Sequence, residues 1–295
     1  MTSKDTSDSS TNRPRNHLVT DATGPYTFAY MQYGKPTSIV VHQTPAEETW
    51  PGGALWDIGV LLSHLMVGLA GGNSNKVQLP PRLLQAIPST NDLSVLELGC
   101  GVGLTGLAAA AAMGTKLTIL TDLKEVVDGV TERNLIENTV ASTGKHPFRV
   151  STAGKRGRVM AMPLCWGDKD DEKAVAEALF DFTKPQKTSR KQKGVPPPKD
   201  PSKPDLIVIG DVAYQHKPGA PSHFDVLVST LLKFLDAHTL VIFGTRMRMP
   251  ASADLLQMFL QHMDEIIEPV AADEIDPSFG KFKHQITIHV FRKKC

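Results

Sequence analysis

Residues 95–106 read VLELGCGVGLTG. An apolar run enters a turn that is dense in glycine, and an alanine-rich segment with helical spacing continues to residue 113. A strand, a glycine turn and a helix in this order present backbone N–H groups at the helix start, and the missing Cβ atoms let a ligand approach the main chain. We therefore predict that a bulky, partly anionic ligand binds at this turn.

Apolar strands and helices alternate from residue 94 onward. We expect strands at residues 95–98, 116–120, 158–164, 206–209, 239–243 and 285–291. We expect the intervening helices at residues 104–113, 125–138, 171–182, 223–235 and 252–263. This alternation predicts an α/β fold with a doubly wound, mostly parallel, Rossmann-like sheet that is covered on both faces. Ligands of such sheets bind at the carboxyl ends of the strands.

The residues before this sheet predict a separate N-terminal extension. Residues 26–33 and 38–43 are rich in aromatic and β-branched side chains, and residues 34–37 (GKPT) between them predict the turn of a β-hairpin. Helices are expected at residues 55–69 and 80–87. We predict a disordered tail at residues 1–17, the hairpin extension at 18–50 and one large α/β domain at 51–295.

Charge and composition exclude several classes of function. The 295 residues carry 32 Lys and Arg against 31 Asp and Glu, which argues against a surface built wholly for nucleic acid or anionic lipid. Residues 184–204 hold seven of the basic residues and one acid, so the remainder is acidic, and this segment reads as a basic, flexible insertion. It is either a solvated loop or a docking segment. Three widely spaced cysteines and no secretory leader favour the cytoplasm or the nucleus.

Two acids flank the glycine turn. Glu97 precedes the first glycine by two residues, where a carboxylate favours a cationic ligand over a pyrophosphate. Asp122 ends the next strand and can accept hydrogen bonds from two ribose hydroxyls, which suits either ligand. Gly101, Gly103 and Gly106 also match the dinucleotide fingerprint G-x-G-x-x-G, which is weak evidence by itself. At this point both a sulfonium cofactor and a dinucleotide remain open.

Four landmarks in order resemble a known family: GALWD at 53–57, ELGCGVG at 97–103, LCWG at 164–167 and DLIVIGDVAY at 205–214. The chain is similar over about residues 52–291 to class I, seven-stranded methyltransferases that use S-adenosyl-L-methionine (AdoMet). More narrowly, it resembles the protein-lysine methyltransferases of the methyltransferase-16 family. The resemblance implies a seven-stranded sheet, AdoMet as cofactor, and a lysine of a ribosomal protein or elongation factor as substrate. It also implies that residues 51–295 form the methyltransferase domain.

The resemblance also implies roles for individual residues. The cofactor-binding residues would be Trp56, Glu97, Gly99, Cys100, Gly101, Gly103, Asp122, Trp166 and Gly210, and no metal is implied. Asp211 and Tyr214, in an Asp-x-x-Tyr motif, would orient the substrate amine and wall its channel. From the residues alone, the two tryptophans are more typical of core aromatics. Asp211 could be a helix cap and Tyr214 a half-buried loop aromatic. The prolines of motifs that act on bases or glutamine are absent at Val212 and Ala213.

Two other functions stay open from the sequence. One is a nicotinamide-dependent oxidoreductase that uses Gly101, Gly103 and Gly106. The other is a non-catalytic module that docks through the basic segment 184–204. For the leading interpretation we expect a monomer with a protein substrate and no membrane, and contact with nucleic acid only through that basic segment.

Overall fold

The computed structural model describes residues 24–44, 51–72, 77–88, 92–139, 151–152, 155–156, 158–183, 199–213, 223–247, 250–281 and 285–294. The predicted tail 1–17, residues 184–198 of the basic segment and Tyr214 lie outside these ranges. Within the described part, no helix combines the length and the apolar character that a membrane crossing requires.

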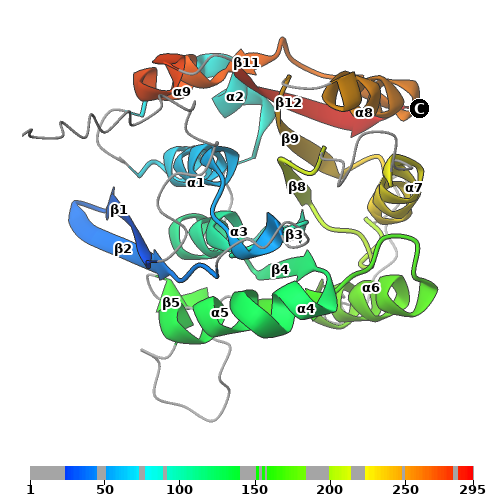
Figure 1. The fold of residues 1–295 in the computed structure, drawn as a ribbon, viewed down its shortest axis with the longest axis horizontal. Coiled ribbons are helices and arrows are strands. Elements are labelled where there is room, and N and C mark those ends of the chain that lie inside the picture. The colour runs from blue at the N-terminus through cyan, green and yellow to red at the C-terminus, as the bar shows by residue number, and fades with distance from the viewer. Residues whose placement is uncertain are drawn as a thin grey trace, which may run out of the picture.

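The centre of the molecule is a mostly parallel sheet with the strand order β10-β12-β9-β8-β3-β4-β7 (Figure 1). Its strands are β3 (Ser94–Leu98), β4 (Leu117–Asp122), β7 (Arg158–Pro163), β8 (Leu206–Gly210), β9 (Leu240–Arg246), β10 (Met263–Glu265) and β12 (Ile286–Lys293). Strand β12 runs antiparallel to its neighbours β9 and β10, and β11 (Val270–Ala271) also pairs with it. The predicted α/β sheet is confirmed, whereas the short strands β10 and β11 were not predicted.

Helices cover both faces of this sheet. One face packs against α1 (Asp57–Leu69), α2 (Pro81–Ala86), α3 (Leu104–Ala108), α5 (Glu132–Thr139) and α9 (Ala272–Ile275). The other packs against α6 (Lys169–Thr183), α7 (Phe224–Phe234) and α8 (Pro250–His262). Successive residues of a strand alternate between the two cores, as Val95 and Leu96 do, because neighbouring side chains of a strand point to opposite faces. Apolar residues on both faces explain why the strands read as continuous apolar runs.

The predicted helices lie in place, with local changes in their winding. Helix α3 continues as a π-helical segment at Ala109–Met113. The helix expected at residues 125–138 is divided into α4 (Lys124–Val126), a π-helical segment at Val127–Thr131, and α5. Short 3-10 turns occur at Pro51–Gly53 and Pro277–Lys281, and β5 (Ser151–Thr152) pairs with β6 (Lys155–Arg156).

The N-terminal hairpin is present, but its turn is shorter than predicted. Strands β1 (Tyr26–Gln32) and β2 (Lys35–Val41) are joined by two residues, Tyr33 and Gly34, with φ of 49° and 74°. The turn expected at residues 34–37 is therefore wrong, because two positive φ angles close a two-residue hairpin and Pro36 pairs within the ladder. The hairpin docks on α5, where the His42 backbone N–H donates to Asn134 Oδ1 at 2.7 Å.

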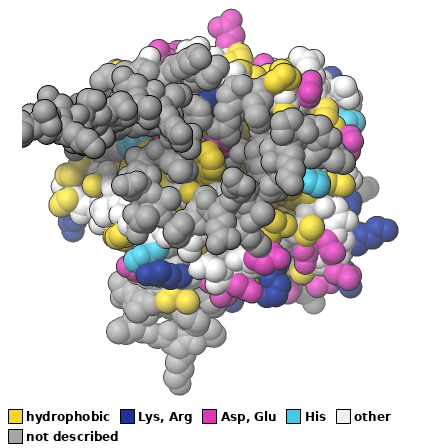
Figure 2. Space-filling model, in the orientation of Figure 1, with side chains coloured by type: hydrophobic (Ala, Val, Ile, Leu, Met, Phe, Trp, Pro, Cys, Tyr) yellow, Lys and Arg dark blue, Asp and Glu magenta, His cyan; other side chains and the backbone are white. Residues whose placement is uncertain are grey.

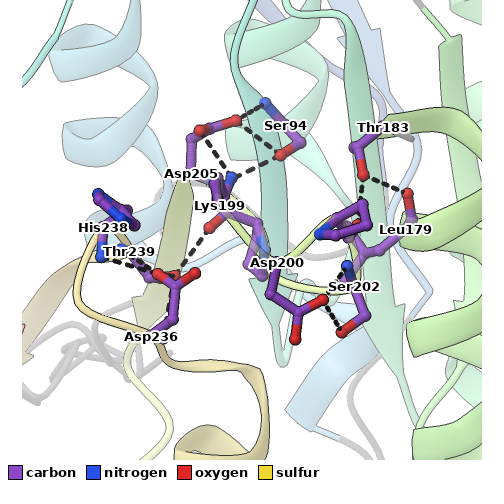
Figure 3. A network of polar contacts seen from close by, with 12 residues as sticks. Ser94, Leu179, Thr183, Lys199, Asp200, Ser202, Asp205, Asp236, His238 and Thr239 are labelled. Carbon is purple, nitrogen blue, oxygen red and sulfur yellow. Dashed lines mark hydrogen bonds and ion pairs between the residues drawn. The ribbon is translucent and has the colours of Figure 1, made fainter. Parts of the chain in front are cut away.

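The C-terminal end of the basic segment is fixed at the amino ends of β3 and β8 (Figure 3). Lys199 forms a 2.6 Å ion pair with Asp205, and Asp205 accepts hydrogen bonds from the backbone N–H and the hydroxyl of Ser94, both at 2.7 Å. Asp200 accepts from the N–H and the hydroxyl of Ser202. This network therefore lies at the amino ends of the strands, on the side of the sheet opposite to the glycine turn.

Candidate active site

The glycine turn lies at the carboxyl end of β3, where the strand order reverses between β4 and β8. Gly99, Gly101 and Gly103 have φ of 72°, 52° and 80°, a region in which residues with a Cβ atom are strained. A Cβ on Gly101 would stand 3.0 Å from the Gly52 carbonyl oxygen. The three glycines are therefore required by the backbone path and by the close approach of residue 52.

Glu97 lies beneath this turn rather than on its surface. Its side chain is buried, and its Oε2 atom accepts a hydrogen bond from the Gly106 backbone N–H at 2.9 Å. Burial, with a smaller contribution from Asp122, raises the pKa of Glu97 to about 8, against the opposing effect of hydrogen bonds from Gly106 and Thr105. The carboxyl group thus holds the first turns of α3 on the sheet. Its preference for a cationic ligand stays a prediction.

The raised pKa of Glu97 predicts a pH dependence of stability. Between its ordinary value of 4.5 and about 8, the folded protein holds a proton that the unfolded chain has lost, so stability falls as pH rises through this window. We expect the melting temperature of the ligand-free protein to fall from about pH 5 to about pH 8 relative to the Glu97→Gln variant. Differential scanning calorimetry measures both profiles, and parallel profiles would contradict the assignment.

Asp122 ends β4 directly beside the turn. Its Oδ2 accepts from the Gly101 N–H and its Oδ1 from the Leu123 N–H, both at 2.8 Å. Burial raises the pKa of Asp122, and these two backbone hydrogen bonds oppose the shift. Each carboxylate oxygen can accept a second hydrogen bond, so the group can still receive two ligand hydroxyls. Leu123 is 40% exposed next to it, an apolar surface that sequence reasoning missed although it directly follows the predicted acid.

The two predicted tryptophans differ in how they relate to the turn. Trp56 precedes α1, and its indole Nε1 donates to the Pro51 carbonyl oxygen at 3.0 Å, next to the Gly52 that approaches Gly101. Trp166 follows β7 and is half-buried, with its Cζ2 atom 3.6 Å from the position that a Cβ on Gly99 would take. Trp166 therefore lies against the turn itself, whereas Trp56 holds the segment that contains Gly52.

Asp211 directly follows β8 and has a φ of 53°, which is uncommon for a residue other than glycine. Its backbone N–H donates to the Gly244 carbonyl oxygen at 3.1 Å, which fixes it to the end of β9. Val212 lies 2.8 Å from the Cβ position of Gly99, so the Asp211 segment touches the glycine turn. A Cβ on Gly210 would stand 2.8 Å from Leu62, so α1 packs closely against the end of β8. Tyr214 lies outside the described residues, and its role stays a prediction.

Two further observations complete the surroundings of the turn. Arg246, at the end of β9, forms a buried 2.9 Å ion pair with Asp57, the residue after Trp56. Sequence reasoning missed this pair, although an arginine at the end of an apolar strand indicates a buried charge that needs an acidic partner.

Burial raises the pKa of the Cys100 thiol, which makes it a small packing residue rather than a nucleophile. In the described part of the chain, no cluster of three or more His, Cys, Asp or Glu side chains could hold a metal ion.

Comparisons with known proteins complement this geometry. Residues 38–183 match the family model described as lysine methyltransferase, a range that contains Trp56, the glycine turn, Asp122 and Trp166 but ends before Asp211. No curated protein matched the sequence.

Several solved structures are similar to the chain in fold. One is SMU.776, assigned as a methyltransferase and complexed with SAH. It is 12% identical in sequence and superposes with a TM-score of 0.48, and the alignment covers 90% of this chain. The chain spans 56% of the length of SMU.776. The TehB-like SAM-dependent methyltransferase of Corynebacterium glutamicum shares 15% identity and a TM-score of 0.38, over 72% of this chain and 86% of its own.

The ribosomal protein L11 methylase of Lactobacillus delbrueckii subsp. bulgaricus shares 17% identity and a TM-score of 0.34, over 69% of this chain and 71% of its own. Because all three TM-scores are below 0.5, nothing about this chain's activity follows from them. The match to the family model stands apart from these likenesses and includes the glycine turn. Residues 38–183, just under half of the chain, are thus similar to the lysine methyltransferase family.

Proposed function

We propose that this protein is an AdoMet-dependent methyltransferase that methylates a lysine side chain of another protein. The observation that carries the proposal is the glycine turn with three left-handed glycines, at the point where the strand order of the sheet reverses. Open α/β sheets bind their ligands outside the carboxyl ends of the strands at such a point. The family match over residues 38–183 supports the lysine specificity.

The residues around the turn suit AdoMet. Asp122 can receive the two ribose hydroxyls, and the exposed Leu123 and the half-buried Trp166 offer apolar surfaces for the adenine. The backbone at Gly99, Gly101 and Gly103 allows close approach because no Cβ atom stands there. When bound, AdoMet would supply an activated methyl group on a sulfonium, which is a good leaving group.

The protein then has to place the substrate amine and exclude water. A lysine side chain has a reference pKa of about 10.4 and must lose a proton before it can attack. We propose that the Asp211 carboxylate orients the incoming ammonium by a charge-assisted hydrogen bond and that solvent or Asp211 takes the proton. We also propose that the aromatic ring of Tyr214 forms one wall of the channel for the substrate lysine.

The substrate class is proposed from charge together with the sequence resemblance. Exposed acidic side chains gather on the side of the molecule where α4 and α6 lie (Figure 2). Glu125 lies in α4, Asp168 directly precedes α6 and Asp170 lies in its first turn, and all three side chains are exposed. An acidic surface of this kind attracts a basic partner, which supports a ribosomal protein or another basic component of translation as the substrate. The cytoplasmic or nuclear location belongs to the same proposal.

A thermal-shift comparison tests the cofactor first. We expect AdoMet and S-adenosyl-L-homocysteine (AdoHcy) to raise the melting temperature and NAD to leave it unchanged, because a ligand at 100 times its Kd adds about 2.7 kcal/mol of stability. Stabilisation by NAD alone would overturn the proposal in favour of an oxidoreductase.

Incubation with labelled AdoMet and a lysate from cells that lack this gene tests the substrate. We expect label on lysines of a protein band, located by mass spectrometry. Label on RNA or small molecules would contradict the lysine specificity. Binding of AdoMet without label on any acceptor would favour the non-catalytic module.

A further inference from the structure

A chain of polar contacts ties the Trp166 loop to the space between α6 and α7. The Gly167 backbone N–H donates to Thr230 Oγ1 at 2.8 Å, and the Thr230 hydroxyl donates to Glu172 Oε1 at 2.7 Å. Lys233 Nζ donates to the other oxygen, Glu172 Oε2. Thr230 is fully buried and Glu172 is 6% exposed, whereas Lys233 reaches the surface. We refer to these four residues, Gly167, Thr230, Glu172 and Lys233, as the Thr230 relay.

Chemistry fixes the direction of every hydrogen bond in the Thr230 relay. A backbone N–H can only donate, so the Thr230 oxygen accepts and its single proton is available for Glu172. A carboxylate can only accept, and the Lys233 ammonium supplies the donor for its second oxygen. Hydrogen bonds to ionised groups are stronger than neutral ones, and burial increases the penalty for breaking them. The hydrogen bonds of the Thr230 relay therefore have a single favourable set of donors and acceptors.

The same face of α7 also packs closely against the Trp166 loop. Gly167 has a φ of 86°, and a Cβ there would stand 3.3 Å from Val226 Cγ1. Val226, Thr230 and Lys233 are spaced four and three residues apart, which places them on one side of the helix. Two other contacts fix the flanks of the loop, since Asp171 accepts from the Cys165 N–H at 2.9 Å and Cys165 accepts from the Asp168 N–H at 2.9 Å. Between these flanks, Gly167 is attached through Thr230.

The Trp166 ring lies beside the residue that Thr230 holds. Trp166 directly precedes it, and the ring edge is 3.6 Å from the Cβ position of Gly99 at the start of the glycine turn. We propose that Thr230 and Glu172 are positioning residues that hold the Trp166 ring against the glycine turn and thereby set the affinity for the cofactor without contacting it. This inference rests on the proposed function, because it takes AdoMet to bind beside Trp166.

The Thr230→Val variant tests the Thr230 relay, because valine keeps the shape of threonine and removes the hydroxyl. The Gly167 N–H and the Glu172 carboxylate each lose a partner, so we expect the Kd for AdoHcy and the KM for AdoMet to rise about tenfold. We expect kcat at saturating AdoMet to stay within about threefold, because Asp211 is untouched. Isothermal titration and steady-state kinetics measure these quantities.

A second measurement follows Trp166 itself in the ligand-free protein. With fluorotryptophan incorporated, we expect the fluorine NMR resonance that disappears in Trp166→Phe to shift or broaden in Thr230→Val. Thr230→Ser keeps the hydroxyl and should restore the wild-type values. Ser229→Ala changes an exposed neighbour on the same helix and should have no effect.

Glu172→Gln provides the test if Thr230→Val does not fold. Glutamine keeps an acceptor for Thr230 and removes the charge that faces Lys233, so we expect a smaller rise in the Kd for AdoHcy, of about threefold. Wild-type AdoHcy affinity and an unshifted Trp166 resonance in a folded variant would overturn the inference. So would a lower kcat with an unchanged KM. If the wild type itself does not bind AdoHcy, the proposed function fails, and the Trp166 resonance still tests the relay.

Discussion

The Asp211→Asn variant is expected to lower kcat for lysine methylation at least about a hundredfold while AdoHcy affinity stays within a few fold. Asparagine keeps the size of aspartate but loses the charge that would orient the ammonium of the substrate. It also tolerates the left-handed backbone at this position, where φ is 53°, better than alanine does. The expected loss is therefore chemical rather than structural.

The controls for Asp211→Asn separate chemistry from folding and binding. Asp225→Asn makes the same change on the exposed first turn of α7 and should leave kcat unchanged. Melting temperatures of both variants should match the wild type. A large loss of AdoHcy affinity in Asp211→Asn would place this residue among the cofactor contacts. Full activity would remove it from the reaction.

Gly106→Ala has the second large expected effect, on stability. A Cβ at this position would stand 2.0 Å from Leu120 Cδ2 and 2.8 Å from Glu97 Oε2, so α3 cannot keep its distance from the sheet. We expect a loss of about 3 kcal/mol in the free energy of unfolding, the upper part of the range for overpacked cores. At about 2–4 °C per kcal/mol for a domain of this size class, the melting temperature should fall by about 6–12 °C.

The same substitution at Gly129 provides the matched control for Gly106→Ala. Gly129 is also in a helical segment, but it is exposed and nothing lies within 4 Å of the position of its Cβ. Gly129→Ala should be neutral or stabilise the protein by up to about 1 kcal/mol, because alanine restricts the unfolded chain. Equal stability of the two variants in urea unfolding would show that α3 can move away from the sheet at no cost.

The correct and the incorrect expectations about the fold have a common explanation. Strand β3, the glycine turn and α3 are all encoded within 15 consecutive residues, so periodicity and glycine content were sufficient to predict them. Strand β10 has three residues and β11 has two, which is too short for any pattern to appear. The sequence predicts the hairpin but places its turn at residues 34–37, because proline is typical of turns, whereas Pro36 lies in β2.

The structure shows where the predicted site residues lie, and their roles stay predictions. Motifs single out Trp56, Asp122 and Trp166, and the structure places Asp122 and Trp166 beside the glycine turn. Trp56 is bonded to Pro51, next to the Gly52 that approaches this turn. Glu97 is predicted to favour a cationic ligand, and the structure shows that its carboxyl group also accepts a hydrogen bond from Gly106 inside the protein. The sequence offers no sign of this, because which atoms a buried carboxyl meets depends on how closely α3 packs on β3.

The amino-acid sequence alone predicts the alternation of the longer strands and helices, the turn that needs glycine, the acid that ends β4 and the acid that follows β8. These features follow from side-chain periodicity and backbone conformation over a few neighbouring residues. Only the tertiary structure decided that Thr230 supports Gly167, 63 residues away, and that Arg246 meets Asp57 across 189 residues. Such pairs leave no pattern in the neighbouring sequence, because they form only when the packed sheet brings segments that are distant along the chain into contact.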